Sequence, residues 1–257
     1  MRALPGDFFI TAESPEAGFG LFSAAHFIWL IIGAAAAILI CLMYRRSSAD
    51  KRRRIRITLA SATLAIELIK TILLVIAGDY GIGRLPLHLC GFSIYFCFVH
   101  AFTKRAPQGI FSQLLYAFCM PGAVFALIVP DWVGYPLFSF MTFSGFMLHF
   151  LITIYVVMQV AGTDIVPDLR RLPACILIML LLAVPVYLFD RSTGTNYMFL
   201  NWPSPGSPLE WFSSLGRPGY LLGYIPLMLV TWVLIYFPFL LCKKRAKNNL
   251  KQKFWST

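Results

Sequence analysis

The feature that most constrains this chain is a series of seven long apolar blocks separated by short polar segments. A helix needs about 20 largely apolar residues to cross the ~30 Å hydrocarbon layer of a membrane, and soluble cores do not require runs of that length. The blocks cover residues 26–44, 57–77, 86–103, 108–129, 137–161, 173–189 and 218–242. The sequence therefore predicts an all-α membrane protein, in which residues 1–257 form a single polytopic domain with a bundle of about seven transmembrane helices.

Composition argues against a soluble domain. The chain is 59% hydrophobic and only 13% charged, which leaves too little polar surface to keep 257 residues in solution. The net charge of +11 would suit nucleic acid, but the cations lie at the edges of the apolar blocks. Orientation in the membrane and contact with anionic lipid explain that arrangement better, so no nucleic-acid partner is expected.

Basic residues alternate between the two sides of the predicted bundle, and short cytoplasmic loops are the ones that collect Lys and Arg. One side carries Arg45, Arg46, Lys51, Arg52, Arg53, Arg54, Arg56, Lys104, Arg105, Arg170, Arg171, Lys243, Lys244, Arg245, Lys247, Lys251 and Lys253. The other side carries only Arg2, Arg84, Arg191 and Arg217. The alternation requires an odd number of spans. It predicts an outer N-terminus and a cytoplasmic C-terminus, in a multi-pass protein of the plasma membrane whose basic face contacts anionic lipid.

Ionisable side chains inside a membrane are costly, so each one needs a partner or a function. Glu67 and Lys70 are three residues apart, where they either neutralise each other, orient a histidine or bind a substrate headgroup. His26 and His88 fall near the outer ends of their blocks, and with Arg84 they would line a polar mouth. Arg84 suits a phosphate group, although snorkelling to the interface is its more ordinary use.

Cys90 and His149 are the candidates for a nucleophile and its base. A thiol inside the membrane is usually a small hydrophobic side chain, and a buried histidine is usually bonded to a backbone carbonyl. His88 and Cys90 are two residues apart on a helix and face different ways, so a base for Cys90 must come from another helix. His149 fits that role, although helical rise separates it from Cys90 by roughly 8 Å along the membrane normal.

The outer connection, residues 190–217, is long and rich in glycine, proline and aromatic residues. It is interpreted either as a lid over a site between helices or as an aromatic belt at the headgroup level. The six cysteines form no CxxC pair, and no two histidines are spaced as metal ligands on one helix. Neither a metal nor a cofactor is expected.

Three segments, LPLHLCGFSIY, GFMLHF and TGTNYMFL, together with the seven blocks, indicate a known family. Over nearly its whole length the chain resembles the YwaF-type bacterial membrane proteins, which are similar to animal transmembrane protein 164. The animal protein is understood as a cysteine-dependent acyltransferase that moves acyl chains between phospholipids and lysophospholipids. The resemblance implies that Cys90 is the nucleophile and His149 its partner histidine.

Three hypotheses about function follow. The first is a membrane-embedded thiol acyltransferase or lipid hydrolase, with phospholipids and lysophospholipids as partners and Asn196, Tyr197 or His88 as donors to the oxyanion. The second is a small-solute or ion transporter or channel, with a polar path lined by His26, Glu67, Lys70, His88 and His149. The third is a non-catalytic membrane protein. The sequence does not give the oligomeric state.

Overall fold

The computed structural model describes residues 7–10, 13, 18–103 and 107–255. The predicted loop cations Lys104 and Arg105, together with Arg2, lie outside the described residues, and side chains are described as far as Leu241. Within these described residues, seven helical segments make up the bundle. They are α1 (Ala24–Arg45), α2 (Ala49–Ala77), α3 (Leu89–Phe102), the continuous stretch of α4 (Ile110–Leu114), η3 (Leu115–Cys119) and α5 (Met120–Ile128), α6 (Phe140–Ala161), α7 (Leu172–Thr193) and α9 (Tyr224–Trp255).

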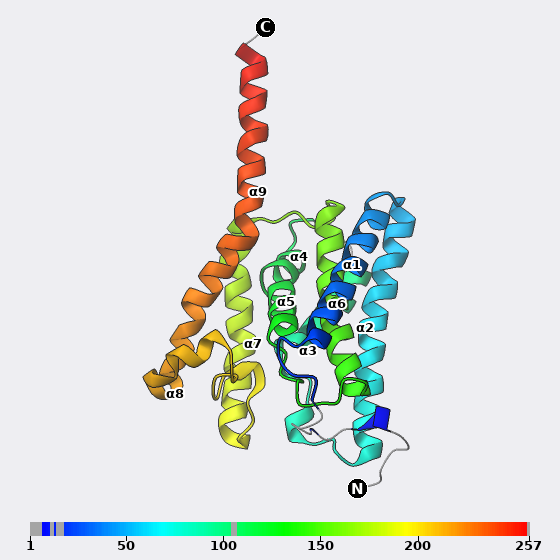
Figure 1. Ribbon diagram of the computed structural model, residues 1–257. Coiled ribbons are helices and arrows are strands. Elements are labelled where there is room, and N and C mark those ends of the chain that lie inside the picture. The colour runs from blue at the N-terminus through cyan, green and yellow to red at the C-terminus, as the bar shows by residue number, and fades with distance from the viewer. Residues whose placement is uncertain (1–6, 11–12, 14–17, 104–106, 256–257) are drawn as a thin grey trace.

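Six stretches of the described chain contain helices long and apolar enough to cross a membrane, and α3 is a shorter apolar helix. The predicted all-α membrane bundle is therefore confirmed, with a difference at the third span. Figure 1 shows α1 starting toward one end of the bundle and α9 extending beyond the other, as an odd number of passes requires. Which end faces the cytoplasm stays a prediction.

The third span starts later than predicted. The expected helix at 86–103 begins at Leu89, because His88 still has extended backbone (φ −68°, ψ 158°). With 14 residues, α3 is about 21 Å long, which is less than the hydrocarbon thickness. The late start places the first turn of α3 inside the bundle instead of at its outer surface.

Two other boundaries differ from the expectation for local reasons. The predicted first basic loop is largely helical, because Ser48 caps α2 by accepting a hydrogen bond from the Lys51 N–H. The sixth span continues beyond residue 189 to Thr193 and ends at Gly194, whose φ of 71° suits glycine. The connection that follows is folded into the short helices η5 (Tyr197–Phe199), η6 (Pro208–Leu215), α8 (Gly216–Gly219) and η7 (Tyr220–Gly223).

Helix α6 is the centre of the fold and contacts α1, α2, α3 and α5. Its sequence is apolar on all sides, as expected of a helix surrounded by protein. Gly33 lets α1 approach closely, since a Cβ there would lie 2.0 Å from the Phe150 ring. Helices α7 and α9 stand on one side of this core (Figure 1), and the Trp232 Nε1–H of α9 donates to the Ala117 carbonyl at 3.0 Å.

The connections gather at the two ends as the charge pattern predicts. The α1–α2 turn and the α6–α7 connection lie at the end where the C-terminus emerges (Figure 1). Arg45, Arg52 and Arg170 belong to this end. The loops after α2, α5 and α7 lie at the opposite end with the N-terminus. For brevity, these are called the basic end and the N-terminal end.

Candidate functional site

The first turn of α3 is built by close backbone packing. A Cβ at Gly91 would lie 2.3 Å from the Pro86 carbonyl oxygen, so the extended segment before α3 folds directly against its first turn. Leu89 lies against Gly122 of α5, where a Cβ would lie 2.7 Å from a Leu89 methyl. Because Gly122 is well inside the span formed by α4 and α5, Cys90 lies deeper in the bundle than a helix starting at Pro86 would put it.

Cys90 is half-buried in this first turn. The charges of Lys70, Asp131 and Glu67 act on its thiol. His88 precedes the helix and makes no side-chain capping bond. The first N–H groups of α3 therefore remain donors that no side chain of the described residues caps, beside a thiol at a helix N-terminus.

Glu67 and Lys70 form the ion pair predicted from their spacing. Lys70 Nζ lies 2.6 Å from Glu67 Oε2, and Glu67 is only 6% exposed. Helix α2 packs on α3, and the Lys70 charge acts on Cys90, His88 and His149. The Glu67–Lys70 pair thus belongs to the surroundings of the candidate site, and its two charges neutralise each other.

His149 is buried on α6 and held from two sides. Its Nδ1 lies 2.7 Å from the Gly145 carbonyl oxygen, and its ring stacks on Trp132 with centroids 4.7 Å apart. A carbonyl oxygen only accepts, so Nδ1 carries the proton and the neutral ring keeps its lone pair on Nε2. No hydrogen bond to Nε2 is found among the described residues. The bond to a backbone carbonyl was the expected ordinary arrangement, and it leaves one nitrogen available as a base.

His88 has the opposite tautomer. Its Nδ1 accepts a hydrogen bond from the Met198 N–H at 3.2 Å, so the neutral ring carries its proton on Nε2. The rings of Tyr197 and Phe199 pack around it with centroids 5.1 and 5.5 Å away. His88 and His149 also interact electrostatically. The arrangement offers one histidine that can accept a proton and one that can donate a hydrogen bond.

Asn196 and Tyr197, expected as oxyanion donors, are used in folding the outer connection. Asn196 Oδ1 accepts from the N–H groups of Asn201 and Trp202, and its Nδ2 donates to the Trp202 carbonyl. The Tyr197 hydroxyl donates to the Ile82 carbonyl at 2.6 Å and accepts from the Leu85 N–H at 2.8 Å. Their polar side-chain atoms are therefore committed to backbone groups.

His26 and Arg84 each bind other groups in the described part of the chain, and the polar mouth with His88 stays a prediction. His26 is fully buried, with Nε2 2.8 Å from the Leu127 carbonyl oxygen and Nδ1 accepting from the Phe22 N–H. Both nitrogens are used, so His26 fastens the start of α1 to the end of α5. Arg84 is exposed and donates through Nη1 to the Tyr135 hydroxyl at 3.0 Å.

Three residues near the site were not singled out from the sequence. Asp131 is exposed, and its charge acts on Cys90, His88 and His149. Trp132 is buried against His149. The only sequence signal for this pair is an acidic and an aromatic residue directly after an apolar block, which is common at membrane interfaces.

Asp190, the third, is fully buried at the end of α7. Its Oδ1 accepts from the Tyr197 N–H at 3.0 Å and from the Thr195 hydroxyl at 2.6 Å. Because the next residue, Met198, binds His88, the carboxylate organises the loop that fixes that histidine. Asp190 is the first residue of the predicted outer connection, where an acidic residue is ordinary, so the sequence did not predict its burial.

Comparison with known proteins gives one result. The family model described as TMEM164 family matches residues 21–236, which is most of the chain and includes every candidate site residue. No curated protein and no solved structure matches the chain. The affiliation with the YwaF-type branch is not tested by this match.

Proposed function

Because the chain belongs to the TMEM164 family, we propose that it is a membrane-embedded thiol acyltransferase or lipid hydrolase that acts on phospholipid and lysophospholipid acyl chains through Cys90 and His149. The observation that carries the proposal is the state of His149. Its Nδ1 is bound to the Gly145 carbonyl, which leaves Nε2 as the base, and it shares the electrostatic neighbourhood of Lys70 and Asp131 with Cys90.

In the proposed first half-reaction, His149 Nε2 takes the proton of the Cys90 thiol as the sulfur attacks the carbonyl carbon of a phospholipid ester. A C–S bond forms and the carbonyl becomes a tetrahedral oxyanion. When this collapses, the ester C–O bond breaks, and the protonated His149 gives its proton to the departing oxygen. The products are a lysophospholipid and an acyl-cysteine.

In the second half-reaction, the hydroxyl of an acceptor gives its proton to His149 Nε2 and attacks the thioester. The C–S bond breaks, and the sulfur recovers the proton from the imidazolium. A lysophospholipid as acceptor makes the protein a transferase, and water makes it a hydrolase. The chemistry is the same in both cases.

Of the three oxyanion donors expected from the sequence, His88 is kept in the proposal, and backbone N–H groups of α3 take the place of Asn196 and Tyr197. His88 carries its proton on Nε2, and the first turn of α3 has N–H groups that no side chain caps. Donors aimed at the developing oxyanion are among the largest contributions to such reactions. The Lys70 ammonium, which acts electrostatically on Cys90, attracts the negative charge that forms on the sulfur.

The transporter hypothesis uses the same polar residues differently. Two of its predicted path residues, Glu67 and Lys70, neutralise each other at 2.6 Å, and both nitrogens of His26 are bonded within the protein. These contacts favour the enzyme. We further propose a plasma-membrane location with the N-terminal end outside, from the distribution of basic loops.

The test is acyl exchange by the purified full-length protein. Wild type and the variants Cys90→Ala, His149→Ala and Cys97→Ala are incubated with isotopically labelled phospholipid and unlabelled lysophospholipid. Mass spectrometry then follows the lipids and the peptide that contains Cys90. Cys97 is a matched control because it lies on the same helix but is fully buried in the core.

The proposal expects exchange in wild type and Cys97→Ala, an acyl adduct on Cys90, and loss of both in Cys90→Ala. His149→Ala is expected to lower the rate of acyl exchange by about 10²–10⁴-fold, the usual contribution of a general base. Folded wild type with neither turnover nor adduct across a broad lipid panel would refute the enzyme, and flux measurements in liposomes would then test transport.

A further inference from the structure

A second polar site lies at the basic end, remote from Cys90 in the fold. It is an open cavity of about 640 Å³ between the first turns of α2, the end of α3 and the α6–α7 connection. Its walls are formed by Ser47, Ala49, Asp50, Arg52, Arg53, Arg56, Phe102, Thr103, Pro107 and Asp164. Three arginines against two aspartates leave one net positive charge in the wall.

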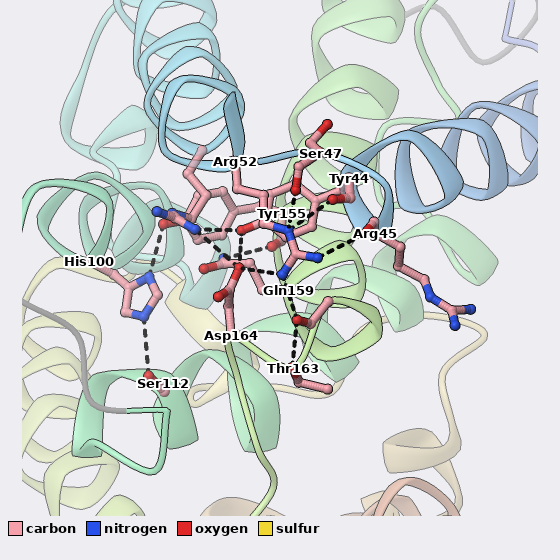
Figure 2. A network of polar contacts seen from close by, with 12 residues as sticks. Tyr44, Arg45, Ser47, Arg52, His100, Ser112, Tyr155, Gln159, Thr163 and Asp164 are labelled. Carbon is pink, nitrogen blue, oxygen red and sulfur yellow. Dashed lines mark hydrogen bonds and ion pairs between the residues drawn. The ribbon is translucent and has the colours of Figure 1, made fainter. Parts of the chain in front are cut away.

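Arg52 lies in the cavity wall and hydrogen-bonds to backbone carbonyls. Its guanidinium donates to the carbonyls of Arg45, Tyr44 and Gly162, so it closes the α1–α2 turn against the end of α6 (Figure 2). The bonded carbonyls belong to the end of α1 and to the residue after α6, so Arg52 ties these two segments together. Arg52 therefore has a structural role, and replacing it would not test ligand binding in the cavity alone.

Arg56 is the residue that points to a ligand. It is only 4% exposed, and its Nη1 donates to the Tyr44 hydroxyl and to Asp164 Oδ2, the latter at 3.2 Å. Its Nε is buried without a hydrogen-bond partner, and Nη2 has none among the described residues. A buried donor without a partner is uncommon in proteins. Nε and Nη2 form the edge of the guanidinium whose two parallel N–H groups fit two oxygens of one phosphate.

Arg53 supplies a second cation at the rim of the same cavity. It is exposed and makes no hydrogen bond or ion pair within the described part of the chain. Asp164 does not cancel this charge, because its carboxylate is already bound by Arg56 and the Tyr44 hydroxyl. Asp50 is the remaining acidic residue of the wall. The cavity thus combines a buried guanidinium edge without partners with an exposed cation, which together suit an anion held by hydrogen bonds from two sides.

We propose that this cavity binds a phosphate group, held by the Nε–Nη2 edge of Arg56 and by Arg53. Two sources have the required chemistry, the headgroup of an anionic phospholipid and a free phosphate. The cavity opens at the end of the bundle where the apolar parts of α1 and α2 stop, which is the level of lipid headgroups. The site is independent of the proposed acyl-transfer chemistry and can be tested without it.

The experiment measures binding of short-chain phosphatidylglycerol, short-chain phosphatidylcholine and inorganic phosphate to the full-length protein in neutral detergent, by titration calorimetry. The variants are Arg53→Gln and Arg56→Lys. Arg56→Lys keeps the charge beside Asp164 but removes the two-pronged edge. Arg54→Gln is the matched control, because Arg54 is equally exposed and adjacent but lines a different cavity with Ile40, Met43 and Leu59.

We expect phosphatidylglycerol to bind, phosphatidylcholine to bind more weakly, and Arg53→Gln and Arg56→Lys each to weaken phosphatidylglycerol by about tenfold, as expected for losing one charged hydrogen bond. Arg54→Gln should stay within about twofold. If inorganic phosphate displaces the lipid, the site accepts free phosphate. If it does not, the ligand is the lipid headgroup.

Two results would overturn the site. Equal losses of lipid affinity in Arg53→Gln and Arg54→Gln would mean diffuse attraction to a basic surface. Wild-type affinity in both Arg53→Gln and Arg56→Lys would mean that the Arg56 edge is already hydrogen-bonded inside the protein, for example through water to the unpaired Gln159 Oε1. Should Arg56→Lys fail to fold, the comparison of Arg53→Gln with Arg54→Gln decides. Acyl exchange measured in Arg53→Gln separates this outcome from failure of the proposed function.

Discussion

Replacing Gly145 by alanine tests whether Trp132 holds His149 in position. A Cβ at residue 145 would lie 2.8 Å from Cδ2 and Cε2 of Trp132. Carbon atoms pack at about 3.5–4.0 Å, so the indole must move by about 1 Å. Trp132 is buried between His149, on which it stacks, and Phe146, whose ring it meets edge-on at 5.5 Å. Because the indole contacts both rings, its displacement is expected to disturb at least one of these contacts.

Two effects of Gly145→Ala follow from this geometry. Overpacking a tight core costs about 1–3 kcal/mol, which should lower the unfolding midpoint in detergent. A displacement of about 1 Å in a catalytic group can cost about 100-fold in rate, so acyl exchange should fall by up to that factor while the protein remains folded. The assay is thermal unfolding by intrinsic fluorescence together with labelled acyl exchange.

A control variant and a compensating double variant test the same contact. Gly83→Ala introduces the same methyl group at a position with nothing within 4 Å, and it should change neither quantity. The double variant Gly145→Ala/Trp132→Phe removes the larger ring and should recover part of the lost stability, as a favourable coupling between contacting residues. Wild-type stability and activity in Gly145→Ala would refute the assigned contact between Trp132 and the histidine.

Three further predictions concern the same end of the molecule. Asp190→Ala should destabilise the protein by about 1–3 kcal/mol, because it removes the buried oxygen that accepts two hydrogen bonds, and limited proteolysis should show faster cleavage at residues 194–207. Gly91→Ala should be more damaging than most surface substitutions, since its methyl group meets a backbone carbonyl that cannot move aside as a side chain can, and the unfolding midpoint measures this. His88→Ala should lower kcat for acyl exchange by about 10²–10³ with little change in KM if its Nε2–H serves the oxyanion, whereas an effect on stability alone would assign it a structural role.

Much of the membrane architecture could be read from local sequence. The apolar blocks predict the helices because the bilayer requires about 20 apolar residues whatever their neighbours are. The Glu67–Lys70 pair could be predicted in the same way, because residues three apart on a helix meet regardless of the surrounding fold. The alternation of basic loops likewise depends only on their order along the chain.

The start of α3 could not be predicted from the apolar pattern. LPLHLCGF reads as one apolar run, and Pro86 is acceptable in a first helical turn. The helix instead begins at Leu89. The Leu89 side chain packs on Gly122 of another span, and the Pro86 carbonyl packs on Gly91, where a Cβ would not fit. The first contact joins segments distant in sequence, and the second joins a helix to the chain that folds back on it. The spacing of apolar residues along the sequence predicts neither contact.

The chemistry of the candidate site was decided in the same way. The sequence places His26, His88 and His149 in apolar blocks but does not say which ring nitrogen of each is available. The tertiary structure gives both nitrogens of His26 to the backbone, gives His88 a proton on Nε2, and leaves the lone pair of His149 on Nε2. Residue identity fixes which groups can titrate, but the carbonyl or N–H that packs against each ring decides which nitrogen is available, and that partner is supplied only by the fold.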